Sequence, residues 1–125
     1  MIGYTTLGTN DFEKAVAYYD ELLKGLNGNQ MMNDGRICIW TNGNMEGMLA
    51  VVKPYDEQPA TVGNGMMVAL NAGSKEKVDE IYAKAIELGG TDEGAPGPRG
   101  DNGVFYGGYF RDLDGNKLVA YCFGG

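Results

Sequence analysis

The hydrophobic and polar positions follow a helical period in two stretches of the chain. In TNDFEKAVAYYDELLKGLNG, Asn10 is the predicted N-cap, and glycines from Gly25 onward are expected to end the helix. In GSKEKVDEIYAKAIELGG, Ser74 is the predicted N-cap and Gly89-Gly90 end the helix. Each stretch therefore predicts a helix with one buried face. The predicted faces are Phe12, Ala15, Val16, Tyr19, Leu22, Leu23 and Leu26, and then Val78, Ile81, Tyr82, Ala85 and Ile86.

Short apolar runs on either side of these helices predict strands. One run precedes each helix, GYTTLG and then GMMVAL. Two runs follow each helix, RICIW with GMLAVV and later VFYGGYF with NKLVAYC, and we allow one weaker strand directly after each helix. Asp114-Gly115-Asn116 is the predicted turn before the last strand, because glycine adopts positive φ without steric cost, and Asp112 is interpreted as a turn residue too.

The two halves repeat each other, since a shift of 63 residues carries Glu13-Lys14 onto Glu76-Lys77 and Tyr19 onto Tyr82. KPYDEQPATVGNG, rich in proline, glycine and polar residues, is the predicted linker. A single βαβββ unit cannot bury its helix and both faces of its sheet, whereas two units can share a cup. We therefore predict one α+β domain with βαβββ modules at 1–58 and 62–125, a curved mixed sheet around a cup, and helices outside.

Composition narrows the possible functions. The chain has no histidine, which excludes serine-histidine and cysteine-histidine nucleophile systems and zinc sites with histidine ligands. A net charge of −7 disfavours nucleic acid. No apolar run is long enough to cross a membrane, and MIGYTTLG lacks the basic start and cleavage site of a signal peptide, so we expect a cytoplasmic protein. Cys38 and Cys122 are expected to be free buried thiols.

The order of these motifs resembles the vicinal oxygen chelate superfamily, which includes glyoxalase I, bleomycin-resistance proteins and extradiol dioxygenases. GYTTLGTNDFEKAVAYYDELL resembles the opening strand and helix of that superfamily. PYDEQPATVGNG, GTDEGAPGPR and YFRDLDGNKL resemble a small glyoxalase-like branch, so the resemblance covers the whole chain. It implies the fold more specifically than it implies an activity, because one fold hosts many chemistries.

The resemblance also implies where a metal would bind. Metal-dependent members take a histidine from the first strand of each half and a glutamate from the last strand. Those positions correspond to Tyr4, Met67 and Val119 in this chain. A single phenolate makes no site, a thioether suits the metals of this superfamily poorly, and valine cannot ligate. We therefore predict no metal and no cofactor.

Strand alternation predicts what lines the cup instead. Thr6 joins Tyr4, Ala69 joins Met67 and Tyr121 joins Val119, while Thr5 and Leu7 face the helix side. The alternative is that Met67 and Val119 only fill space. The predicted ligand-binding set is Tyr4, Thr6, Trp40, Met67, Arg99, Tyr106, Val119 and Tyr121.

Three members of this set carry alternatives of their own. Trp40 either packs in the core or stacks on a ligand, and either Tyr106 or Tyr109 is expected to point into the cup. The segment EGAPGPRGDNG, residues 93–103, is interpreted as a loop that could act as a lid. Its Arg99 either clamps a carboxylate or phosphate or is a solvated loop residue.

Three functions remain open for the cup. The first is binding of a small organic molecule, as in bleomycin-resistance relatives, with aromatic side chains lining a dry pocket. The second is a metal-independent lyase or isomerase that uses Tyr4 or Tyr121 as its catalytic group, although an ordinary tyrosine is a poor base at neutral pH. The third is an interaction protein with a vestigial cup. A homodimer is expected, with the modules pairing either within one chain or across the dimer.

Overall fold

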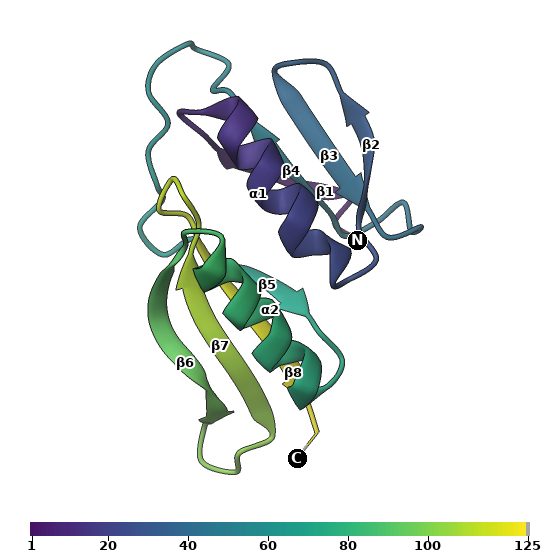
Figure 1. Cartoon of the computed structure of the whole chain (residues 1–125), viewed down its shortest axis with the longest axis vertical. Helices are drawn as coiled ribbons and strands as arrows, with labels where there is room; N and C mark the ends of the chain where they lie inside the picture. The colour runs from purple at the N-terminus through teal and green to yellow at the C-terminus, as the bar shows by residue number, and fades with distance from the viewer. Residues whose placement is uncertain (125) are drawn as a thin grey trace. The chain divides into compact units, whose positions relative to one another are not determined.

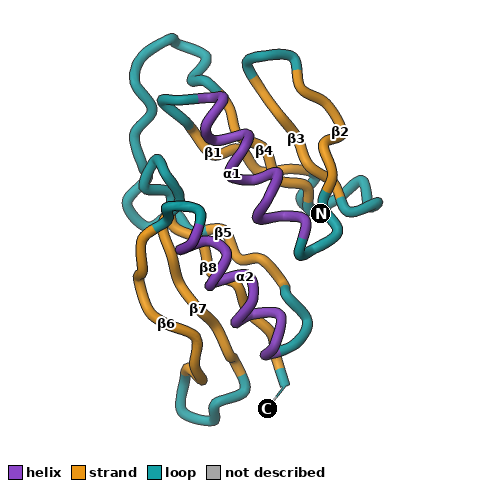
Figure 2. The backbone as a smooth tube through the Cα atoms, viewed as in Figure 1, coloured by secondary structure: helices purple, strands orange, loops and turns teal. Residues whose placement is uncertain are grey.

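The computed structural model describes residues 1–124 and divides the chain into two compact units, Met1–Val62 and Gly63–Gly125. Each unit contains one helix and one four-stranded mixed sheet (Figure 1). The order of elements is βαβββ in both (Figure 2). The predicted α+β class and its repeated module are therefore confirmed. None of the described helices is long and apolar enough to cross a membrane.

The first unit places its sheet strands in the order β1-β4-β3-β2, with β1 and β4 parallel and the other pairs antiparallel. Its helix follows the first strand and covers one face of the sheet (Figure 1). The elements are β1 (Tyr4–Gly8), α1 (Phe12–Lys24), β2 (Asn29–Asn33), β3 (Ile37–Thr41) and β4 (Met48–Val52).

The side chains of β3 identify the helix-covered face. Trp40 is only 2% exposed, its ring lies 5.8 Å from that of Tyr19 in α1, and its indole N–H donates to the Asp20 carboxylate at 2.9 Å. The amide of Gln30 on β2 donates to the same carboxylate at 2.9 Å. One acidic residue of α1 therefore connects the helix to two strands, and it satisfies the N–H of the largest buried side chain.

The opposite face of this sheet, which we call the helix-free face of the first unit, holds a separate apolar cluster. Ile39, Met48 and Ala50 are buried there, and Ile37 packs against them. Because partners in register share a face, Tyr4 beside Met48 and Thr6 beside Ala50 belong to this face. Leu7 is buried and pairs with Val51 on the helix-covered face, consistent with the alternation predicted from the sequence.

The N-terminus of α1 differs from the sequence prediction by one residue. The N-cap is Asp11, whose Oδ1 accepts a hydrogen bond from the Lys14 backbone N–H at 3.2 Å. Asn10 instead exchanges two hydrogen bonds with the backbone of Ala60, at 2.7 and 3.1 Å. The asparagine is thus used to attach the loop after β4 to the start of the helix. The predicted N-cap of the second helix, Ser74, is correct.

The second unit repeats the arrangement with sheet order β5-β8-β7-β6, in which β5 and β8 are parallel. Its helix covers one face of the sheet (Figure 1). The elements are β5 (Val68–Asn71), α2 (Lys75–Glu87), β6 (Thr91–Arg99), β7 (Phe105–Arg111) and β8 (Lys117–Phe123).

The segment predicted as a loop at 93–103 is largely a strand. Residues 93–99 belong to β6, an edge strand paired with β7, and only the residues after Arg99 form the connection to β7. The two prolines do not prevent pairing, because an edge strand tolerates a missing N–H, and the register shifts twice between Asp92 and Gly97. The proposed lid is therefore wrong for most of this segment.

The connection between α1 and its sheet can be tested at Asp20. Replacing Asp20 by alanine leaves the buried indole N–H of Trp40 without its acceptor, so we expect the free energy of unfolding to fall by about 1–3 kcal/mol. Glu21→Ala is the matched control, because the adjacent carboxylate forms an ion pair with Lys24 at the helix surface and should change stability by less than about 0.5 kcal/mol. Urea unfolding of both variants measures the difference, and equal losses would contradict this role of Asp20.

Candidate functional site

The second sheet also has a helix-covered and a helix-free face, and contacts of β7 distinguish them. The Tyr106 hydroxyl donates to Asp79 of α2 at 2.8 Å. A Cβ atom added at Gly108 would lie 3.1 Å from the Tyr82 ring of α2. Tyr106, Gly108 and Phe110 therefore face the helix. Phe105, Gly107 and Tyr109 alternate with them and point to the other side.

The helix-free face of the second unit carries a cluster of aromatic side chains. Phe105 and Tyr121 stack with ring centroids 5.3 Å apart and planes at 4° to each other. Phe123 meets both rings edge-on and is 68% exposed. Gly107 leaves the space for this stack, because a Cβ there would lie 2.7 Å from the Phe105 ring and 3.1 Å from Val119. Phe105 and Tyr121 are half-buried, and together with the exposed Phe123 they form a partly exposed aromatic surface of a kind that binding sites often present.

Two cations lie against Tyr109, on the same sheet face as the aromatic cluster. The Arg99 guanidinium and the Lys117 ammonium each lie 5.5 Å from the centroid of the Tyr109 ring. Arg99 also donates to the Ala95 carbonyl oxygen at 2.7 Å, which holds its side chain against β6. Cations over a ring keep their charge, so this face combines positive charge with flat apolar surface. That combination suits a planar organic anion.

The structure brings some of the predicted site residues together and separates others. Met67, Arg99, Val119 and Tyr121 are assigned to the second unit. By strand alternation Arg99, Val119 and Tyr121 lie on the helix-free side. Met67 precedes β5 instead of lying within it, and Val119 is fully buried.

Tyr4 and Thr6 lie on the helix-free face of the first unit, where Tyr4 is 53% exposed.

Trp40 and Tyr106 lie on helix-covered faces instead. Trp40 packs in the core, which was the alternative to a ligand role, and its N–H is satisfied by Asp20. Of the two tyrosines expected to compete for the cup, Tyr109 lies on the helix-free face and Tyr106 does not. Sequence reasoning missed Phe105 and Lys117. The register that pairs Gly107 with Tyr121 would have identified Phe105 as a neighbour of Tyr121.

The positions implied for a metal do not fit one. Tyr4 offers one phenol, Met67 one thioether and Val119 only methyl groups. Within residues 1–124, no group of three or more histidine, cysteine, aspartate or glutamate side chains could hold a metal ion. The two cysteines, Cys38 and Cys122, are buried and free, and burial raises the pKa of Cys38 to about 11. A thiol of that pKa is a poor ligand and a poor nucleophile at neutral pH.

Comparisons with known proteins agree with the fold. The family model described as the glyoxalase/bleomycin resistance protein/dioxygenase superfamily matches residues 1–120. A glyoxalase/bleomycin resistance protein from Albidiferax ferrireducens is 33% identical, with a TM-score of 0.89 and 99% of each chain covered. A lactoylglutathione lyase from Agrobacterium tumefaciens is 23% identical, with a TM-score of 0.71, covering 98% of this chain and 92% of that one. No curated protein matches the chain.

Two tyrosines on the helix-covered face of the second unit have raised pKa values. The Tyr82 hydroxyl donates to the Asp92 carboxylate at 2.7 Å, and this hydrogen bond, with a smaller effect of burial, raises the pKa of Tyr82 to about 12. The same bond, together with the Gly94 N–H, lowers the pKa of Asp92. Hydrogen bonding to Asp79 likewise raises the pKa of Tyr106. Both phenols are thus harder to ionise than in the unfolded chain, and both act as structural donors.

The raised pKa of Tyr82 predicts how the free energy of unfolding changes at alkaline pH. The folded pKa of Tyr82 lies above the unfolded value of 10.0, so its contribution is complete below pH 10 and is lost as pH rises toward about 12. Tyr82→Phe should therefore reduce the fall in the urea midpoint over that range. Part of the fall should remain, because Tyr106 also has a raised pKa. Tyr55→Phe, at an exposed position, is the matched control and should retain the full fall. If the urea midpoints of Tyr82→Phe and Tyr55→Phe fell identically with pH, the hydrogen bond from Tyr82 to Asp92 would be ruled out.

Proposed function

Because the chain belongs to the glyoxalase/bleomycin resistance protein/dioxygenase superfamily, we propose that it binds a small planar organic anion on the helix-free face of its second unit, without a metal. The observation that carries this proposal is the stacked pair Phe105 and Tyr121 on the same sheet face as Arg99 and Lys117. Apolar surface with a few placed polar groups is the usual composition of a small-molecule site.

Each part of this face has a role in the proposal. The exposed ring of Phe123 extends the aromatic cluster formed by Phe105 and Tyr121, and it supplies a surface on which a flat ligand stacks. The planar guanidinium of Arg99 matches the two oxygens of a carboxylate, and Lys117 adds a second positive charge. In a chain of net charge −7, such a local excess of cations favours an anion over a cation at this position.

The observations support binding better than tyrosine catalysis. A tyrosine that acts as a base at neutral pH needs a lowered pKa. The tyrosines with carboxylate partners, Tyr82 and Tyr106, have raised values instead, and they lie on the helix-covered face. Nothing about Tyr4 or Tyr121 favours the lyase or isomerase alternative over binding. We therefore keep a single proposed function.

A planar aromatic carboxylate, 2-naphthoate, is a suitable probe of this face. We expect saturable binding in isothermal titration calorimetry. Arg99→Gln should weaken it about tenfold, because charge-assisted hydrogen bonds are worth about 1.5–3 kcal/mol before exposure reduces them. Phe123→Ala removes an exposed ring that meets Phe105 and Tyr121 edge-on, so it should weaken binding and lower the unfolding midpoint only slightly.

Lys84→Gln is the matched control for these variants. It removes one positive charge from α2, where Lys84 pairs with Glu87, and should leave the affinity within about twofold of the parent chain. Equal weakening by Lys84→Gln and Arg99→Gln would show a general charge effect and refute the proposed site. Absence of saturable binding would refute it as well.

A further inference from the structure

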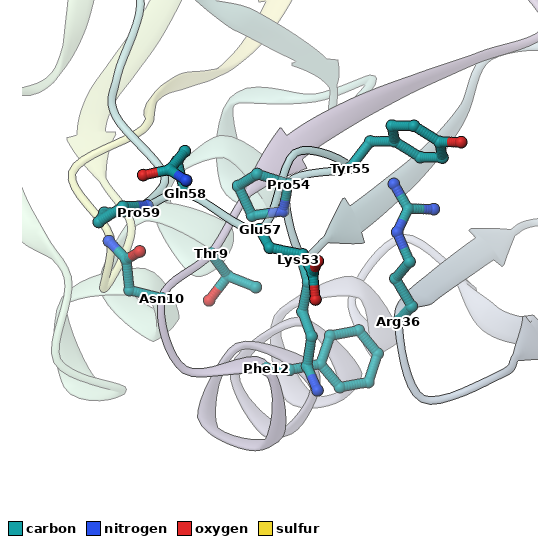
Figure 3. Close-up of a pocket in the computed structure, with 10 residues that line it drawn as sticks. All are labelled: Thr9, Asn10, Phe12, Arg36, Lys53, Pro54, Tyr55, Glu57, Gln58 and Pro59. Carbon is teal, nitrogen blue, oxygen red and sulfur yellow. The ribbon is translucent and has the colours of Figure 1, made fainter.

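A pocket of about 650 Å³ lies within the first unit, at the end of the sheet where β1 and β4 stop and α1 begins (Figure 3). Phe12 from the helix forms part of its wall. Arg36, which precedes β3, and Lys53, which follows β4, also line it, and Figure 3 shows the Arg36 side chain directed toward Tyr55 and the Lys53 side chain directed toward Phe12. The loop after β4 closes the pocket with Tyr55 and Glu57. This pocket is separate from the helix-free faces, and its role does not depend on the function proposed above.

The register of β3 and β4 places two basic residues opposite each other at this pocket. Ile37 pairs with Val52, and the Lys53 backbone N–H donates to the Arg36 carbonyl oxygen at 2.9 Å, so Arg36 and Lys53 stand opposite each other on neighbouring strands. Like charges directly opposite each other across an antiparallel pair destabilise it.

The described part of the chain, residues 1–124, supplies no carboxylate in contact with either cation, because the ion pairs found there involve neither of them. Asp34 lies nearby, but one of its oxygens accepts the backbone N–H groups of Arg36 and Ile37 at 2.9 Å. Glu57 lines the pocket without forming an ion pair. The backbone hydrogen bonds of Ile37 and Arg36, and to a smaller extent the Arg36 charge, lower the pKa of Asp34, so Arg36 is partly balanced without an ion pair. Lys53 forms no ion pair within residues 1–124.

Aromatic rings hold the two cations in place. The Lys53 ammonium lies 5.6 Å from the centroid of the Phe12 ring, and the Arg36 guanidinium lies 5.3 Å from that of Tyr55. Such contacts orient a cation and leave its N–H donors free for an acceptor. The donors of two oriented cations at one pocket match the oxygens of a small anion.

We propose that this pocket binds a small oxyanion, a phosphate group or a carboxylate, between Arg36 and Lys53. The Glu57 carboxylate repels a simple anion and sets a limit on its affinity. Glu57 has a left-handed backbone conformation, with φ of 63°, which is uncommon for a residue other than glycine. A ligand that carries a hydroxyl or ammonium group beside its oxyanion would satisfy Glu57 as well.

The test uses the full chain labelled with ¹⁵N, and inorganic phosphate and malonate as separate probes, at ionic strength matched with sodium chloride. We expect saturable amide shifts confined to the segments around Phe12, Arg36 and 53–58. Saturation by phosphate alone identifies phosphate groups as the ligand class, and saturation by malonate identifies carboxylates. Shifts that do not saturate with either probe, or that sodium chloride reproduces, would overturn the proposal.

Variants make the assignment specific to this pocket. Arg36→Gln and Lys53→Gln should each weaken binding about tenfold, and because both side chains are exposed neither change should shift the unfolding midpoint appreciably. Glu57→Gln should strengthen binding by removing the repelling carboxylate. Lys24→Gln is the matched control, since it removes one positive charge of α1 outside the pocket and should leave the affinity unchanged. Equal weakening by all three cation variants, or weaker binding in Glu57→Gln, would contradict the proposed site.

Discussion

Each four-stranded sheet of this chain has a helix on only one of its faces, and the remaining features depend on that constraint. Side chains alternate along a strand, so each strand contributes one set of residues to the helix and another to the opposite face. The helix-directed sets form ordinary cores, exemplified by Trp40 under α1 and Phe110 beneath α2. The other sets are free of that packing requirement, and in the second unit they include the stacked rings of Phe105 and Tyr121.

The two units use their helix-free faces differently. The first carries aliphatic and thioether side chains around Ile39 and Met48, with an exposed phenol at Tyr4. The second carries the aromatic stack of Phe105 and Tyr121 with two cations beside Tyr109. Val119 is buried on this second face and carries no charge, so it adds no negative charge beside the two cations.

Much of this architecture could be predicted from the sequence, because hydrophobic periods of 3.6 and 2 and the internal repeat report local structure directly. Both helices, the N-cap Ser74 and the position of Tyr4 on the sheet face opposite to Leu7 followed from such patterns. The strand at Thr91–Arg99 could not be recognised, since its prolines and glycines are typical of a loop and only pairing with β7 reveals it.

The composition of the site was harder to predict than the fold. Which face a tyrosine occupies depends on a register that tertiary contacts determine. Tyr106 and Tyr109 both lie in β7, and their sequence neighbours do not distinguish them. Tyr106 donates to Asp79 of α2, whereas the ring of Tyr109 contacts the Arg99 guanidinium. The opposition of Arg36 and Lys53 depends in the same way on the pairing of β3 with β4, two strands separated along the chain by a loop.

The division of each sheet into two faces can be tested most directly by intermolecular nuclear Overhauser effects between 2-naphthoate and the aromatic ring protons of the second unit. The account predicts contacts to Phe105, Tyr121 and Phe123, which share the helix-free face. It predicts no contacts to Tyr82 or Tyr106, which donate to carboxylates on the helix-covered side. Contacts to Tyr82 or Tyr106 in place of Phe105 and Tyr121 would contradict the account.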